Sequence, residues 1–238
     1  MTDLVPQSRP TRRRGVGLAA AGLALALLLG ACGPGANGIQ KETGPAIIKA
    51  AGKALSRAHQ FQISENLTSQ GHTESLIFNV AGPNQGEGTF STSGLSFQAE
   101  ELDGVDYFRS KNLWSQVGGT SLQQALGDQW VFAAASSPTA AQLSAAFAGL
   151  TSAKSLAAQL TAGAKGAVRG KVSSLDGSSV VAVAEASAGT VYIATHGTPY
   201  PLRWDHGSEG SAEFRDFGRH FKLKKPKKPV SLAAIMGG

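Results

Sequence analysis

The feature that most constrains the fold is a two-residue hydrophobic period between residues 60 and 117. Turn sequences such as "PNQGEG" and "DG" separate the alternating runs, the last of which is "VDYFRSKNLWSQVGG". Neighbouring residues of a strand point to opposite faces, so the pattern predicts a meander of short antiparallel strands with one apolar face. We expect that concave face to carry Phe61, Ile63, Leu76, Phe78, Phe90, Leu95, Phe97 and Tyr107.

Helical patterns lie before and after this meander. An amphipathic helix is predicted over residues 44–59, with Pro45 in its first turn. Two alanine-rich segments, "SPTAAQLSAAFAGL" and "SAKSLAAQLTAGA", predict two short helices within residues 121–164. Their narrow apolar stripes contain Leu143, Phe147, Leu156 and Leu160.

Alternation then resumes and continues through "SAEFRDFGRHFKL", which ends at Leu223. The order is therefore helix, strands, helices, strands. This order predicts an α+β domain over residues 44–238, in which a helical insertion divides one antiparallel sheet. Small residues around the helical stripes leave two alternatives open, a cavity for a ligand or a tightly packed, closed core.

The first 31 residues predict a lipoprotein signal peptide. Arginines 9 and 12–14 precede an apolar run over residues 15–29, which is too short to cross a bilayer as a helix. The tetrad Leu29-Gly30-Ala31-Cys32 resembles the bacterial lipobox, and this resemblance implies cleavage between Ala31 and Cys32 with acyl chains on Cys32. A signal peptide followed by a free cysteine is the weaker alternative, and the export route, general secretion or twin-arginine, stays open.

Residues 32–43 predict a flexible tether, because they are rich in glycine and polar residues. The stretch "GPGANG" within them matches G-x-G-x-x-G, but a dinucleotide site needs a strand before this motif and a helix after it. A cleavage site precedes it here, so we interpret these glycines as spacer.

Charge and cysteine content exclude several classes of protein. The 238 residues carry a formal charge of +6, which falls to +3 once residues 1–31 are removed. No broad basic face remains for nucleic acid, and a single cysteine excludes an internal disulfide. One basic cluster remains, which either is a solvated strand end or contacts anionic headgroups: Lys222, Lys224, Lys225, Lys227 and Lys228.

Motifs that carry chemistry are absent from the sequence. The five histidines show no H-E-x-x-H or i, i+4 spacing, and G-x-S-x-G and S-x-x-K do not occur. We therefore expect no metal, no cofactor and no catalytic residue, and a protein that is not an enzyme. We also expect the protein to be a monomer.

Two stretches resemble a known family. "LDGVDYFRSKNLWSQVGG", with Gly104, Tyr107, Arg109 and Trp114, resembles a segment of LolA-like lipoproteins. "GTVYIATHGTPYPLRWDHGSEGSAEFRDFGRHFKLKKP" is similar to the C-terminal half of LppX/LprG-type actinobacterial lipoproteins. The order of elements agrees with this family over residues 44–235.

The resemblance implies an antiparallel half-barrel that wraps around helices and encloses an apolar cavity. It further implies a hydrophobic, acylated lipid as ligand, a role in envelope lipid transport, and anchoring at the extracytoplasmic face of the cell membrane. The alternative from another class is a lipid-anchored interaction module with a closed core, which serves a protein partner at the envelope.

Overall fold

The computed structural model describes residues 35–69, 71–133, 145, 151–185 and 188–236. Residues from Pro34 onward form one compact unit. Ala31, Cys32, Leu143 and Phe147 lie outside the described residues. The predicted signal peptide, cleavage site and first insertion helix therefore stay predictions.

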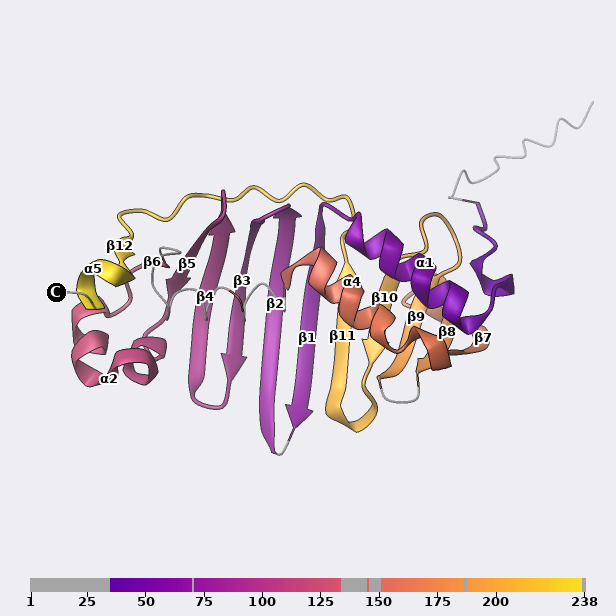
Figure 1. The fold of residues 1–238 in the computed structure, drawn as a ribbon, viewed down its shortest axis with the longest axis horizontal. Helices are drawn as coiled ribbons and strands as arrows, with labels where there is room; N and C mark the ends of the chain where they lie inside the picture. Colours follow the sequence, from indigo (N-terminus) through magenta and orange to yellow (C-terminus); the bar gives the residue numbers. More distant parts are fainter. Residues whose placement is uncertain (1–34, 70, 134–144, 146–150, 186–187, 237–238) are drawn as a thin grey trace, which may run out of the picture. The chain divides into compact units, whose positions relative to one another are not determined.

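Within the described residues, one twelve-stranded open sheet runs through the domain in the order β12-β6-β5-β4-β3-β2-β1-β11-β10-β9-β8-β7 (Figure 1). All neighbouring strands are antiparallel except β12 and β6. The strand bounds are β1 (Phe61–Ser69), β2 (His72–Gly82), β3 (Gln85–Thr92), β4 (Leu95–Leu102), β5 (Val105–Arg109), β6 (Val131–Ala133), β7 (Val168–Leu175), β8 (Ser178–Glu185), β9 (Gly189–Ala194), β10 (Pro201–Asp205), β11 (Gly210–Arg215) and β12 (Val230–Ser231).

The helices are α1 (Gly44–Ser56), α2 (Leu113–Leu126), α4 (Ala153–Ala162) and α5 (Leu232–Met236), with short 3-10 turns η1 (Ile39–Lys41), η2 (Ala164–Gly166) and η3 (Gly207–Glu209). Helices α1 and α4 lie side by side over the half of the sheet formed by β1 and β7–β11 (Figure 1). The prediction of an α+β fold with helices inserted between two groups of antiparallel strands is confirmed.

The sheet has two distinct faces, which the strand register defines. The inner face, toward α1 and α4, carries buried apolar side chains such as Ile63, Phe78 and Val183. The outer face carries a mostly polar row of directly paired residues: Gln62, Asn79, Glu87, Glu100 and Tyr107.

Close contact between α1 and α4 closes the core over their half of the sheet. Gly52 of α1 faces Thr161 of α4, and a β-carbon at position 52 would overlap the Thr161 methyl group. Ala157, Leu156 and Leu160 are buried at the same helix pair. The small residues around the helical stripes therefore serve tight helix packing in this half.

The segment after β5 corrects the prediction that strand alternation continues through residue 117. The chain leaves the sheet at Ser110, whose Oγ accepts hydrogen bonds from the backbone N–H groups of Asn112 and Leu113, both at 3.0 Å. These bonds satisfy donors at the start of α2, as a cap does. Leu113 and Trp114 are buried residues of α2. These apolar residues, which the sequence pattern assigned to a strand, therefore contact the core from a helix.

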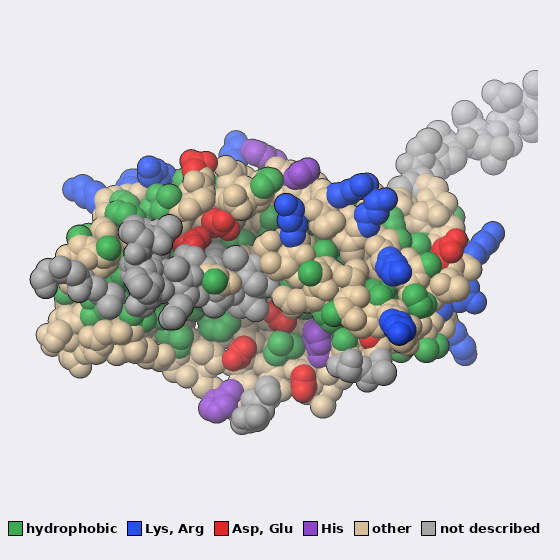
Figure 2. Space-filling view, in the orientation of Figure 1, with side chains coloured by type: hydrophobic (Ala, Val, Ile, Leu, Met, Phe, Trp, Pro, Cys, Tyr) green, Lys and Arg blue, Asp and Glu red, His purple; other side chains and the backbone are tan. Residues whose placement is uncertain are grey.

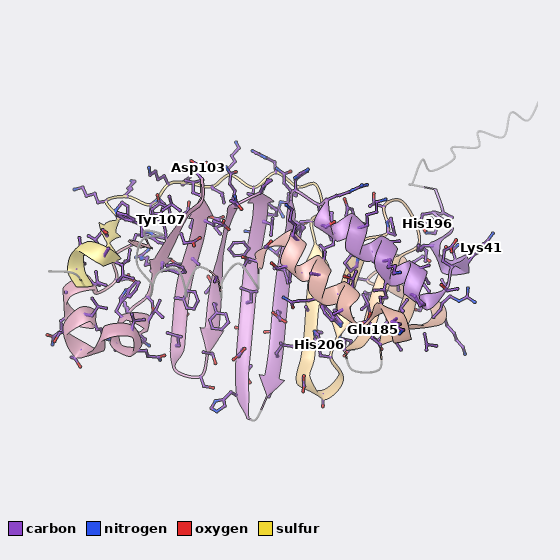
Figure 3. The ribbon with its side chains drawn as sticks, in the orientation of Figure 1. Lys41, Asp103, Tyr107, Glu185, His196 and His206 are labelled. Atoms are coloured by element: carbon purple, nitrogen blue, oxygen red, sulfur yellow. The ribbon has the colours of Figure 1, made fainter. Side chains whose placement is uncertain are left out.

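Residues 35–41 contact the domain, although the sequence predicted a flexible tether there. The backbone N–H of Asn37 donates to Thr195 O at 2.9 Å, and its side-chain amide donates to Ala194 O and Gly197 O, both at 3.0 Å. Ala36 forms a β-bridge with His196, and Figure 3 places His196 and Lys41 at the same end of the domain.

The C-terminal segment crosses the sheet instead of ending as a strand. Strand β11 ends at Arg215, and the chain then runs along one end of the strands to β12, which pairs in parallel with β6 (Figure 1). Pro226 is buried within this segment, whereas the side chains of all five lysines of the 222–228 cluster are exposed. Figure 2 shows basic side chains along this edge.

The contact between Gly52 and Thr161 leads to a testable prediction. Gly52→Ala should lower the free energy of unfolding by about 1–2 kcal/mol, because overpacking exceeds the helix propensity gained by alanine. Thr161 is held by its hydroxyl, which donates to Ala157 O at 2.9 Å. In a Thr161→Ser background, which keeps the hydroxyl and removes the methyl group, Gly52→Ala should be neutral or stabilising. Urea unfolding of the four proteins measures this; equal effects in both backgrounds would contradict it.

Candidate functional site

An aromatic band crosses the inner face of strands β2–β5 and consists of Leu76, Phe90, Phe97 and Phe108. Leu76 pairs with Phe90 and Phe90 with Phe97 in the strand register. The ring centroids of Phe90 and Phe97 are 5.1 Å apart, and those of Phe97 and Phe108 are 6.2 Å apart. Such distances are typical of favourable aromatic pairs.

Burial differs along this aromatic band. Leu76 and Phe108 are buried, with 3% and 1% of their surface exposed, whereas Phe90 and Phe97 are half-buried, as is Leu95 nearby. Among the described helices, α1 and α4 cover the other half of the sheet (Figure 1). The centre of the band thus retains apolar surface that the described elements do not cover.

Two glycines of β3 create space beside the aromatic band. Gly86 and Gly88 lie on the inner face, opposite Val80 and Phe78 of β2. The ring of Phe78 lies against both glycines, so that a β-carbon at position 88 would approach it to 2.6 Å. Because β3 lacks side chains at these two positions, the Phe78 ring packs directly against this strand.

A cavity of about 460 Å³ lies next to these glycines. It is bounded by the end of α1, the start of α4 and the β2–β3 turn, where Ser152 Oγ caps α4 by accepting the Ser155 N–H at 3.4 Å. Apolar parts of Ala58, Phe78, Val80, Pro83 and Ala153 line it together with polar groups. The polar lining is Ser56, His59, Asn84, Gln85, Glu101, Thr151, Ser152, Lys154 and Ser155.

Two carboxyl groups on the inner face of β1 and β4 have raised pKa values. Burial, and secondly the nearby Asp106, raise the pKa of Glu101, which lines the cavity. Burial, and secondly Glu74, raise the pKa of Glu65, which lies in the row of Leu76. Desolvation disfavours the charged carboxylate in both cases. The inner face is thus a poorly hydrated environment even where it carries acidic residues.

The structure separates the predicted site residues into two groups. Leu76, Phe78, Phe90, Leu95 and Phe97 lie together on the inner face of β2–β4, at the aromatic band and cavity. The others are fully packed in the core between the sheet and the helices: Phe61 and Ile63 of β1, and Leu156 and Leu160 of α4.

Tyr107 corrects the prediction, because it lies on the outer face. It pairs with Glu100, whereas its neighbour Phe108 pairs with Ala99 and completes the aromatic band on the inner face. Consecutive strand residues point to opposite faces, so choosing Tyr107 rather than Phe108 shifted the assignment by one residue. The Phe108 side chain was the signal that sequence reasoning missed; the cavity residues from the β2–β3 turn carried no comparable pattern.

No group of three His, Cys, Asp or Glu side chains in the described ranges is arranged to hold a metal ion. None of the helices in the same ranges has the length and apolar character to cross a bilayer.

The site and fold define a class of protein, namely an α+β domain whose open antiparallel sheet carries a partly uncovered apolar inner face. No family model matches the chain, and no curated protein matches it. Among solved structures, it is similar to LprF from Mycobacterium bovis, with 12% identity, a TM-score of 0.45, and coverage of 82% of this chain and 99% of that chain. It is also similar to the Mycobacterium tuberculosis lipoprotein LppX, with 15% identity, a TM-score of 0.41, and coverage of 76% and 97%.

Unequal burial along the aromatic band predicts unequal costs of truncation. Phe108→Ala should lower the free energy of unfolding by about 3–5 kcal/mol, since it leaves a cavity in a closed part of the core. Phe90→Ala should cost clearly less, because Phe90 is half-buried. Urea unfolding measures both values. Equal costs would mean that Phe90 is as tightly packed as Phe108.

Proposed function

We propose that this protein is an exported lipoprotein that binds an apolar or acylated lipid on the inner face of β2–β5. The lipid's acyl chains lie against Phe90, Leu95 and Phe97, and one end of the ligand enters the adjoining cavity. The protein acts in envelope lipid handling from the extracytoplasmic face of the cell membrane. The observation that carries this proposal is the half-buried centre of the aromatic band beside a cavity of about 460 Å³.

Apolar burial supplies the binding energy in this proposal. Each Å² of apolar surface removed from water contributes roughly 25 cal/mol, and the half-buried phenylalanines still expose such surface. Polar groups at the cavity, Lys154 and His59 among them, suit the headgroup end of an amphiphile. Ligand sites commonly combine an apolar wall with a few polar groups in this way.

The alternative function, an interaction module with a closed core, and the lipid-binding proposal make different demands on the inner face of β2–β5 only. Under α1 and α4 the core is closed, as that alternative requires. Over β2–β5 the centre of the aromatic band stays half-buried beside the cavity, and this favours a ligand instead.

Membrane attachment through Cys32 belongs to the same proposal. Gly35 O accepts a hydrogen bond from the Gly197 N–H at 3.1 Å, so the domain begins there. Only residues 33 and 34 separate Cys32 from this point. Extended chain spans at most about 3.6 Å per residue, so an acylated Cys32 would lie within roughly 11 Å of Gly35 and hold the domain close to the bilayer.

Native mass spectrometry of the purified protein tests lipid binding. We expect co-purifying lipid in the wild type and a loss of most of it in Phe90→Ser/Phe97→Ser, which removes the centre of the aromatic band. Ile77→Ser is the matched control, because Ile77 lies on the outer face of β2 with 54% of its surface exposed. Absence of lipid from the wild type, or equal loss in both variants, would contradict the proposal.

A second pair of variants tests the cavity within the same experiment. Ala153 lines the cavity at the start of α4, whereas Ala158 of the same helix is exposed. Ala153→Trp should reduce lipid occupancy by filling the space, and Ala158→Trp should leave it unchanged. Thermal melting of both proteins must show a folded domain, so that lost binding is not lost structure.

Anchoring is tested separately by Cys32→Ala. The variant should remain uncleaved or become soluble, whereas the wild type should partition into detergent, because two or three acyl chains hold a protein firmly to a bilayer. Intact-mass measurement of the wild type should show the added lipid. A free thiol on Cys32 in the wild type would overturn the anchor without affecting the lipid-binding proposal.

A further inference from the structure

A pair of carboxylates lies on the outer face of the sheet, opposite the proposed lipid site. Glu87 of β3 and Glu100 of β4 are directly paired in the register. Like charges at directly opposite positions destabilise a sheet. The residues beside them in the same row are Asn79 and Tyr107, which supply no positive charge.

Glu100 is the more unusual member of this pair. Only 4% of its surface is exposed, and its Oε1 is buried without a hydrogen-bond partner. Burial, and secondly Glu87, raise the pKa of Glu100 to about 7. Within the described part of the chain, no Lys or Arg forms an ion pair with either carboxylate. A buried carboxyl group in this state is stabilised either by remaining protonated or by a partner that offsets the desolvation of its charged form.

A hollow of about 350 Å³ is present at these carboxylates. Ile77 and Trp130 form its apolar wall, and Asn79 and Gln98 add amide groups. Ile77 exposes 54% of its surface, which is unusual for a large apolar side chain in the middle of a strand. The hollow thus combines two carboxyl groups with an aliphatic and an indole surface.

We propose that this hollow binds an organic cation, an alkylammonium or alkylguanidinium group whose hydrocarbon stem contacts Ile77 and Trp130. The cation donates charge-assisted hydrogen bonds to both carboxylates, and an indole favours a neighbouring cation. A metal ion is the poorer ligand, because no third His, Cys, Asp or Glu of the described residues completes a coordination group here. The site lies on the face opposite the aromatic band and does not depend on lipid binding.

The experiment is a titration of the purified, ¹⁵N-labelled protein followed by the indole N–H signals in NMR spectra. The sequence has three tryptophans, and Trp130→Phe identifies the signal of Trp130. The probes are agmatine, the peptide Gly-Arg-Gly and calcium chloride. We expect agmatine to shift the Trp130 signal saturably. A matching effect of Gly-Arg-Gly assigns the cation to a protein side chain, and an effect of agmatine alone assigns it to a free amine; either outcome supports the site.

Variants separate this site from non-specific charge effects. Glu87→Gln and Glu100→Gln should each weaken agmatine binding about tenfold, the value expected for losing one hydrogen bond to a charged group. Glu213→Gln is the control, because this outer-face carboxylate already pairs with Arg215. No saturable shift at millimolar agmatine, a shift by calcium alone, or equal weakening by Glu213→Gln would overturn the proposal.

The pH dependence supplies a further readout. Agmatine should bind more tightly at pH 8 than at pH 6, since Glu100 is ionised only above a pKa of about 7. The other titratable groups facing Glu100 are Glu87 and Tyr107, and Arg109 nearby is paired with Asp128 at 2.8 Å. Without a ligand, the raised pKa stabilises the folded state at low pH, and this contribution is lost as the pH rises through 7. Glu100→Gln should remove both effects while melting no lower than wild type at pH 8, which excludes unfolding as the cause of lost binding.

Discussion

Pairing between β1 and β11 is the interaction on which the rest of the domain depends. It pairs two strands that are separated by more than a hundred residues, and it thereby makes one continuous sheet of the two meanders. Ile63 pairs directly with Phe214, and the ring of Phe61 lies 6.4 Å from that of Phe214 and 5.6 Å from that of Phe217. This aromatic packing compensates for the entropy of closing so long a loop. Without it, α1 and α4 would have no common inner face to cover.

The inner face is divided by what covers it. Over β1 and β7–β11, glycine and alanine allow α1 and α4 to pack closely, and the core is closed. Over β2–β5, Gly86 and Gly88 remove side chains and the phenylalanines at the centre of the aromatic band stay half-buried. Glycine thus admits a neighbouring helix in one half and the ring of Phe78 in the other. Apolar burial within one sheet therefore serves both stability and ligand binding.

Carboxyl groups with raised pKa values occur on both faces of the sheet, at positions where an ordinary core would carry apolar side chains. Glu65 and Glu101 lie on the inner face and Glu100 on the outer face, and burial is the main cause of the raised pKa in each. Desolvated acids of this kind cost stability and cluster at functional sites. Here they lie beside the proposed lipid site and the proposed cation site. The two sites are separated by the thickness of a single sheet, and each can be removed by substitution without reaching the other.

Sequence by itself determined the α+β class, most strands, and the apolar residues that meet on β2–β4, because a two-residue period directly encodes the faces of a strand. It could not choose between Tyr107 and Phe108, since two adjacent aromatic residues satisfy either register, and only the pairing with Ala99 decided that Phe108 faces inward. It also missed α2 and the contacts of residues 35–41, which depend on a cap at Ser110 and on hydrogen bonds to residues 194–197. The parallel β12–β6 pair and the hollow beside Glu100 were likewise decided by tertiary structure. These features join residues that are distant along the chain, and local periodicity carries no information about such contacts.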